Sequence, residues 1–101
     1  MALKIKWSPE AIEDLESIAE FIARDSKNYA SSVVNKVIAS TKNIADFPLM
    51  GCVTPEISDK KIRECFIYSY RLIYLVKSKE ILILAIIHGK RLLDRISDRF
   101  D

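Results

Sequence analysis

Two arginines lie within a stretch that otherwise favours a β-sheet. The sequence IRECFIYSYRLIY, residues 62–74, is rich in isoleucine, leucine, phenylalanine and tyrosine, which suit a pleated, half-buried surface. Arg63 and Arg71 lie near its two ends. A guanidinium is costly to bury without a partner, and its planar fork of donors matches a phosphate or a carboxylate. The spacing therefore predicts a clamp for an anionic partner on the body of the sheet.

Each of these polar residues also has a structural interpretation. Arg63 could pair with Glu64 or Glu56, and Arg71 with an acid of the first predicted helix. His88 is the only histidine of the sequence and ends a long apolar run. It could cap a strand end through hydrogen bonds, contact a partner, or move a proton.

Charge is distributed unevenly along the chain. Residues 8–25 carry six acidic side chains and one arginine, a net charge of −5, whereas residues 60–79 carry six basic side chains and one glutamate, a net charge of +5. The whole chain has a net charge of only +2. Such asymmetry favours one face that meets an anionic partner and another that faces water. The alternative is solvated charge that clusters by chance.

The first half of the chain predicts a strand followed by a helix. LKIKW, residues 3–7, alternates apolar and basic residues, as a half-buried strand does. Ser8 then provides a helix N-cap and Pro9 suits the first helical position. We expect this helix to run to about Arg24.

A second helix follows almost at once. Asp25 or Ser26 can open it, its apolar stripe runs with a period of about 3.6 residues, and Pro48 ends it. Because the link is short, the two helices are expected to form an antiparallel hairpin with facing apolar stripes.

The second half predicts three strands, at residues 62–67, 70–76 and 81–88, after a turn-rich loop at residues 47–59. The last of them, ILILAIIH, is apolar until its final residue, which indicates a central strand covered on both faces. Residues 89–101 could add a short amphipathic helix.

The expected fold is therefore α+β, in the order β-α-α-β-β-β, with a helical hairpin on one face of a curved antiparallel sheet. The opposite face is too apolar to be left fully wet, so we expect a partner to cover it. We interpret residues 1–101 as one domain.

Composition places few further constraints on function. No segment reaches the ~18 consecutive apolar residues of a membrane span, and the N-terminus lacks a signal-peptide core. Cys52 and Cys65 have no metal-ligand spacing and are expected to be reduced. We therefore expect a cytoplasmic protein with no cofactor and no metal.

The ordered motifs of the chain resemble those of the RelE/ParE superfamily of type II toxin–antitoxin toxins, and are closer to its ParE-like branch. The match covers nearly the whole chain. It comprises WSPEAIEDLESIAEFI at residues 7–22, PLMG at 48–51, PEISDKKIRE at 55–64, YRLIY at 70–74 and IIHGKR at 86–91. The resemblance implies the fold just derived and an antitoxin that neutralises the toxin through a helix in a groove or an added strand.

One branch of this superfamily, similar to RelE, cleaves messenger RNA in the ribosome. That activity needs cations at the phosphate and groups that transfer protons. The candidates here are Arg63, Arg71, His88 and the carboxylates of Glu64 or Glu56. No tyrosine follows Tyr74, so the aromatic acid that this branch often carries near its C-terminus is missing.

The other branch, similar to ParE, inhibits DNA gyrase and catalyses no reaction. Its members tend to close the last strand with H-G-x-R, as His88-Gly89-Lys90-Arg91 does here. We therefore favour a gyrase-inhibiting toxin of the plasmid-stabilisation type, with the ribosome-dependent endonuclease as the alternative. The residues expected to contact the target or antitoxin are Arg63, Arg71, Tyr74, His88, Lys90 and Arg91.

Overall fold

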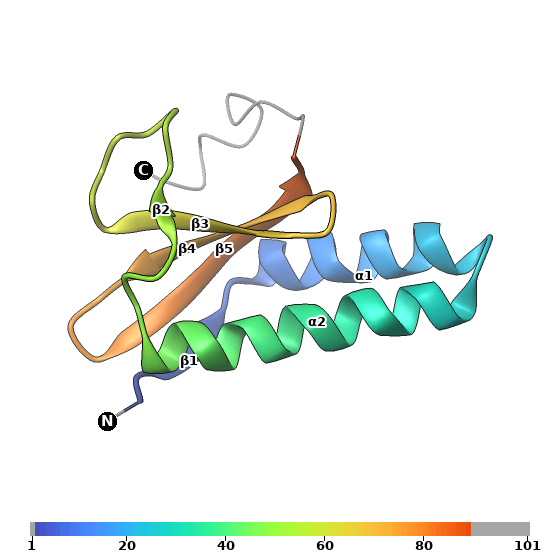
Figure 1. The fold of residues 1–101 in the computed structure, drawn as a ribbon, viewed down its shortest axis with the longest axis horizontal. Helices are drawn as coiled ribbons and strands as arrows, with labels where there is room; N and C mark the ends of the chain where they lie inside the picture. Colours follow the sequence, from blue (N-terminus) through green and yellow to red (C-terminus); the bar gives the residue numbers. More distant parts are fainter. Residues whose placement is uncertain (1, 90–101) are drawn as a thin grey trace.

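The computed structural model describes residues 2–89. Its elements are β1 (Lys4–Trp7), α1 (Pro9–Ala23), α2 (Lys27–Asp46), β2 (Cys52–Val53), β3 (Ile62–Ile67), β4 (Tyr70–Val76) and β5 (Glu80–His88). The two helices lie antiparallel on one face of a five-stranded sheet in the order β1-β5-β4-β3-β2 (Figure 1). The predicted α+β class and helical hairpin are confirmed. The expected C-terminal helix, Lys90 and Arg91 lie outside the described residues.

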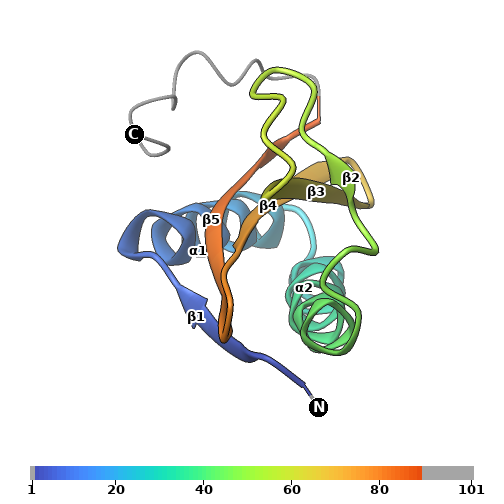
Figure 2. The same ribbon diagram turned by 90° about the vertical axis from the view of Figure 1, so that its left-hand side faces the viewer.

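The sheet is mixed, which differs in one strand from the expected antiparallel sheet. β1 pairs with β5 in parallel, while β2, β3, β4 and β5 pair antiparallel in turn. The alternation in residues 3–7 predicts a strand but carries no information on its direction. β2, a two-residue strand at the sheet's far edge, was also missed, because it lies inside the turn-rich loop (Figure 2).

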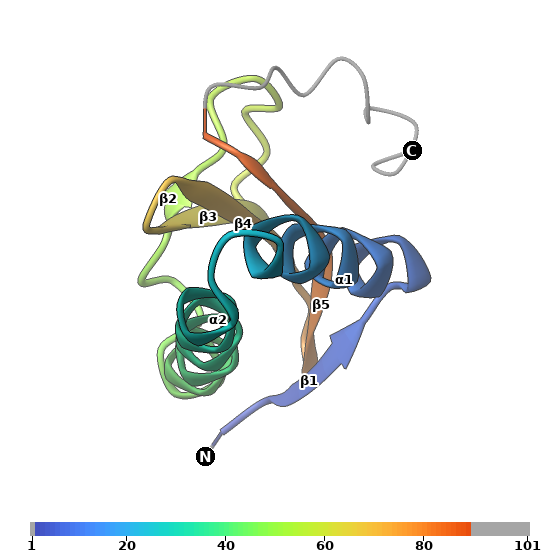
Figure 3. The same ribbon diagram turned by 90° about the vertical axis from the view of Figure 1, so that its right-hand side faces the viewer.

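Both helices begin where their capping residues predict. The Ser8 hydroxyl accepts a hydrogen bond from the Ala11 N–H at 3.1 Å, and Ser26 accepts one from the Tyr29 N–H at 3.0 Å. Each cap satisfies a backbone donor that has no partner within the helix. Figure 3 shows the resulting pair of helices against the sheet, with α1 nearest β5.

The sheet has two apolar faces, which we call the helix face and the outer face. Residues such as Leu72, Ile83 and Ile86 on the helix face pack in the main core with the two helices. A second cluster occupies the outer face and consists of Ile62, Ile73, Leu84, Ala85 and Ile87. All five are buried, and Ile57 from the β2–β3 loop packs against them. The outer face is therefore not an open apolar surface at its centre, contrary to our expectation.

Tyr74 fastens the turn after α2 to the sheet. Its hydroxyl donates to the Pro48 carbonyl at 2.9 Å and accepts from the Gly51 N–H at 3.0 Å. A Cβ on Gly51 would lie 2.6 Å from both the Tyr74 hydroxyl and the Glu64 carbonyl oxygen. Only glycine fits there without displacement, which explains the glycine of the PLMG sequence.

Replacing Tyr74 by phenylalanine should lower the free energy of unfolding by about 1–3 kcal/mol, because the buried Gly51 N–H loses its acceptor. Urea denaturation measures this change. Tyr68→Phe is the matched control, since the Tyr68 side chain is 54% exposed. Equal midpoints for Tyr74→Phe and the wild type would contradict this role of the hydroxyl.

Candidate functional site

Arg71 lies in a buried ion network on the outer face of the sheet. Its side chain donates to both carboxylate oxygens of Glu56, at 2.8 and 2.9 Å, and from Nε to Glu64 Oε1 at 3.1 Å. A further short hydrogen bond joins Arg71 Nη2 to Glu64. Arg71 is 5% exposed and Glu64 is 6% exposed. Two carboxylates thus surround this guanidinium, so it is not an open anion clamp.

The expected pairing of Arg71 with an acid of the first helix was wrong. Arg71 lies opposite Ile87 in the sheet register, and Ile87 belongs to the outer-face cluster. The helices cover the other face, so their acids are on the wrong side of the sheet. Glu56, from the β2–β3 loop, takes the place of a helix acid.

The network shifts the ionisation of its members. Hydrogen bonds with Glu56, followed by those with Glu64, raise the pKa of Arg71 above its usual value although burial opposes this. In return, the hydrogen bonds from Arg71 lower the pKa of Glu56 below its ordinary value of 4.5. Both effects favour the charged forms.

Arg63 lies at a separate point of the sheet. It donates to three backbone carbonyls: to Gly51 at 2.8 Å, to Lys60 at 3.1 Å and to Leu49 at 3.4 Å. The expected pairing with Glu64 or Glu56 is not formed. Arg63 instead holds the turn that Tyr74 also fastens. Tyr74 itself is fully buried and presents no contact surface in this structure, whereas Arg63 is half-buried.

His88 lies at the opposite end of the sheet, on its helix face. Successive side chains of β5 point to opposite faces of the sheet at this end. Ile86 belongs to the main core on the helix face, while Ile87 belongs to the cluster on the outer face. His88 therefore shares the helix face with Ile86. It forms an edge-to-face ring contact with Tyr70, at a centroid distance of 5.8 Å and an interplanar angle of 78°.

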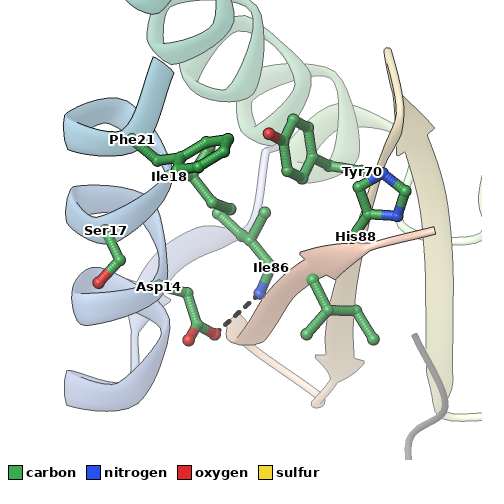
Figure 4. Close-up of a pocket in the computed structure, with 8 residues that line it drawn as sticks. Asp14, Ser17, Ile18, Phe21, Tyr70, Ile86 and His88 are labelled. Atoms are coloured by element: carbon green, nitrogen blue, oxygen red, sulfur yellow. Dashed lines mark hydrogen bonds between the residues drawn. The ribbon is translucent and has the colours of Figure 1, made fainter. Parts of the chain in front are cut away.

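A hollow of about 390 Å³ opens beside this histidine, between α1 and the end of β5 (Figure 4). β1 pairs with β5 only as far as Ile83, so the rest of the β5 edge faces α1. The N–H of Ile86 donates across this gap to Asp14 Oδ2 at 3.1 Å. The hollow is lined by Asp14, Ser17, Ile18, Phe21, Tyr70, Ile86, Ile87 and His88.

Two further hollows, of about 320 and 440 Å³, adjoin His88. Aromatic side chains surround the three, and we call this set the aromatic rim. It comprises Phe21, Tyr29, Phe66, Tyr68, Tyr70 and His88. Tyr29 and Tyr68 meet edge to face at 5.8 Å, and they join α2 to the β3–β4 turn. The first five of these residues were not predicted as a site, although Phe21 and Tyr29 lie outside the apolar stripes of their helices.

The candidate residues of the sequence thus lie in three places. Arg71 and Glu64 are on the outer face, His88 is on the helix face, and Arg63 is at the turn after α2. In the sheet register, His88 lies opposite Tyr70 and Arg63 lies opposite Tyr74. These two tyrosines of β4 are four residues apart, so their backbones are separated by roughly 13 Å at strand spacing. Within residues 2–89, no cluster of His, Cys, Asp and Glu suits a metal ion, and neither helix is long and apolar enough to cross a membrane.

A helical hairpin on a five-stranded mixed sheet, with a helix-face hollow at the end of β5, is the fold of the small RelE/ParE toxins. The model of the ParE toxins of the parDE type II toxin–antitoxin system matches residues 5–93. The chain belongs to this family.

Solved structures show the same fold. The chromosomal ParDE system of P. aeruginosa matches with a TM-score of 0.71 and 22% identity, over 88% of this chain and 98% of that one. The RelBE2 toxin–antitoxin complex of Mycobacterium tuberculosis matches with a TM-score of 0.61 and 16% identity, over 87% of this chain and 99% of that one. The YoeB dimer of Staphylococcus aureus matches with a TM-score of 0.60 and 20% identity, over 87% of this chain and 98% of that one. A comparison with curated protein sequences finds no match.

The Glu56–Arg71 contact should make stability depend on pH. The folded-state pKa of Glu56 lies below the unfolded value, so the contact stabilises the fold above about pH 4.5 and is lost as the pH falls through the folded pKa. Glu56→Gln should lower the free energy of unfolding by about 1–2 kcal/mol at pH 7, since Glu56 is partly exposed. Urea denaturation from pH 7 to pH 3 should show this difference shrinking.

Glu16→Gln is the control for this series, because Glu16 is an exposed acid on α1. The free energy of unfolding of this variant should equal that of the wild type at every pH of the series. A Glu56→Gln difference that stays constant down to pH 3 would contradict the assigned contact.

Proposed function

We propose that this toxin inhibits DNA gyrase by binding and catalyses no reaction of its own. The main support is that His88 and Arg71 lie on opposite faces of the sheet. A ribonuclease needs its proton-transfer group and its phosphate-binding cation around one reacting phosphate. A residue pair separated by the sheet does not meet that requirement.

The state of the two arginines supports the same proposal. Arg71 already donates to two carboxylates, and Arg63 to three carbonyls. A phosphate would have to displace these partners before either guanidinium could bind it. Displacing these partners would leave the buried Glu64 carboxylate without its cation, which is costly.

The matched family belongs to the parDE system, and the sequence resemblance implies that ParE-like toxins act on gyrase. Family membership also implies a cognate antitoxin that binds and neutralises this chain. A gyrase-directed toxin works where the chromosome is, so we expect the protein in the cytoplasm.

The proposal predicts that purified toxin, incubated with gyrase, ATP and supercoiled DNA, causes gyrase-dependent DNA cleavage complexes to accumulate. Binding alone would trap the enzyme on its DNA. Gel electrophoresis after detergent and protease treatment measures the linear product. Toxin premixed with an equimolar amount of its antitoxin is the control and should leave no linear product.

Translating ribosomes provide the opposing assay. Messenger RNA should remain intact when the toxin is added, because the candidate cations and the histidine do not converge. Unchanged supercoiling at saturating toxin, together with codon-specific RNA cuts that disappear in His88→Ala, would overturn the proposal in favour of the endonuclease.

A further inference from the structure

We propose that the hollow of about 320 Å³ between the helical hairpin and the β3–β4 turn binds the guanidinium of an arginine that a partner protein presents. We call this hollow the cation cage. Its aromatic walls are Phe21, Tyr29, Tyr70 and His88, and its carboxylate is that of Asp25. The proposal does not depend on which macromolecule the toxin inhibits.

The aromatic walls of the cation cage come from both helices and from two strands. Tyr70 of β4 lies opposite His88 of β5 in the sheet register, and their rings meet edge to face. Phe21 of α1 and Tyr70 point towards one another across the space between helix and sheet (Figure 4). The first turn of α2 adds Tyr29, whose N–H donates to the capping hydroxyl of Ser26. Secondary structure thus holds all four rings around one space.

The rings leave much of their surface open to a ligand. Phe21 is 64% exposed and Tyr29 is 46% exposed. The face of an aromatic ring carries the negative part of its quadrupole, so it attracts a cation that lies close above it. Several rings around one hollow add their attractions and exclude water from the bound group. This arrangement favours an organic cation over an anion or a neutral polar group.

Asp25 adds a full negative charge to the cation cage. Two N–H groups, of Asp25 and Ser26, donate to the Ile22 carbonyl at 3.0 Å and fix the short link between the helices. Within residues 2–89, the Asp25 carboxylate forms no ion pair. Arg24 and Lys27 flank it in the sequence, yet neither lines the hollow. The charge of the lining is therefore complementary to a cation.

The chemistry of the lining selects arginine over lysine. A guanidinium is planar and more weakly hydrated than an ammonium, so it stacks on rings and loses less on leaving water. Its parallel N–H groups also match the two oxygens of a carboxylate such as that of Asp25. The cation cage combines both features, an aromatic surface and one carboxylate.

The surroundings favour an arginine within a polypeptide over a free amino acid. Free arginine carries its own carboxylate into the neighbourhood of residues 8–25, which have a net charge of −5. An arginine inside a protein lacks that group. The adjoining hollow of about 390 Å³, lined in part by Ile18 and Ile86, can then take an apolar side chain next to it.

The test is a titration of the full-length, isotope-labelled toxin followed by NMR. The probes are the end-blocked tripeptide Gly-Arg-Gly and the same tripeptide with citrulline, whose neutral urea group has nearly the shape of a guanidinium. The arginine peptide should shift the amide signals of residues 21–29, 68–70 and 88. Its Kd should be at least about 5-fold lower than that of the citrulline peptide, because only the arginine peptide carries the charge.

Two pairs of variants locate the binding. Asp25→Asn keeps the size of the side chain and should weaken the arginine peptide by about 5-fold. Glu20→Gln, an exposed acid of α1 that lines a different hollow, is the control and should match the wild type.

Phe21→Ser should likewise weaken binding, because one ring of the cation cage is lost. Phe47→Ser should not, since Phe47 is 68% exposed on the turn after α2 and lies outside the lining. Thermal melts verify that all four variants fold.

Three results would overturn the cation cage. The first is equal affinity for the arginine and citrulline peptides, or for the arginine peptide and its lysine counterpart. The second is equal affinity of Asp25→Asn and Glu20→Gln for the arginine peptide. The third is a single-stranded oligonucleotide that shifts the same signals at lower concentration, since stacked bases would then be the ligand. The gyrase assay is independent of all three, so either proposal can fail alone.

Discussion

The buried guanidinium of Arg71 determines which face of this sheet is available. An arginine on an apolar sheet needs compensation, and here Glu64 from the neighbouring strand and Glu56 from the β2–β3 loop supply it together. Satisfying the charge draws the loop towards the outer face, where Ile57 joins the second apolar cluster. The same interaction thus neutralises the cation and helps close the face. The cost of desolvating these charged groups offsets much of their attraction, so the network is weak evidence of added stability.

With the outer face closed at its centre, interaction surface remains on the helix side. There the packing is asymmetric, because β1 is four residues long and β5 is nine. Beyond the shorter strand, α1 contacts the β5 edge through Asp14 and through the Ser8 hydroxyl, which donates to the Leu84 carbonyl at 3.3 Å. The mismatch in strand length is what creates the hollow. Phe21, Tyr70 and His88 line this hollow, and the two adjoining hollows are lined in part by Tyr29 of α2 and Tyr68 of the β3–β4 turn.

Much of this fold follows from local sequence, while the contacts between distant residues do not. β3 and β4 begin and end at the predicted residues, and Ser26 caps α2, because periodicity and capping are local properties. The direction of β1 depends on where the helical hairpin returns the chain, which no local pattern records. The predicted partners of Arg63 and Arg71 were wrong for the same reason. Which side chains lie near an arginine depends on its face of the sheet and on the strand register.

The aromatic rim was missed for a related but different reason. Apolar residues off a helix stripe are common on protein surfaces and need no explanation singly. Phe21 and Tyr29 are informative only because folding brings them next to Tyr68 and Tyr70. A signal did exist, since each helix carries one large aromatic residue outside its stripe near the hairpin loop.

The placement of rigid and open parts fits a protein that acts by binding. The turn after α2 is held by Tyr74, Gly51 and Arg63, and the outer face by the Arg71 network, so neither has to become ordered when a partner arrives. Preorganised surfaces lose little conformational entropy on association. A catalytic site would instead require polar groups held ready around a reacting atom, with their hydrogen-bonding capacity directed at it. Within residues 2–89, the Arg71 guanidinium and the carboxylates of Glu56 and Glu64 are directed at one another, which agrees with the proposed function by binding.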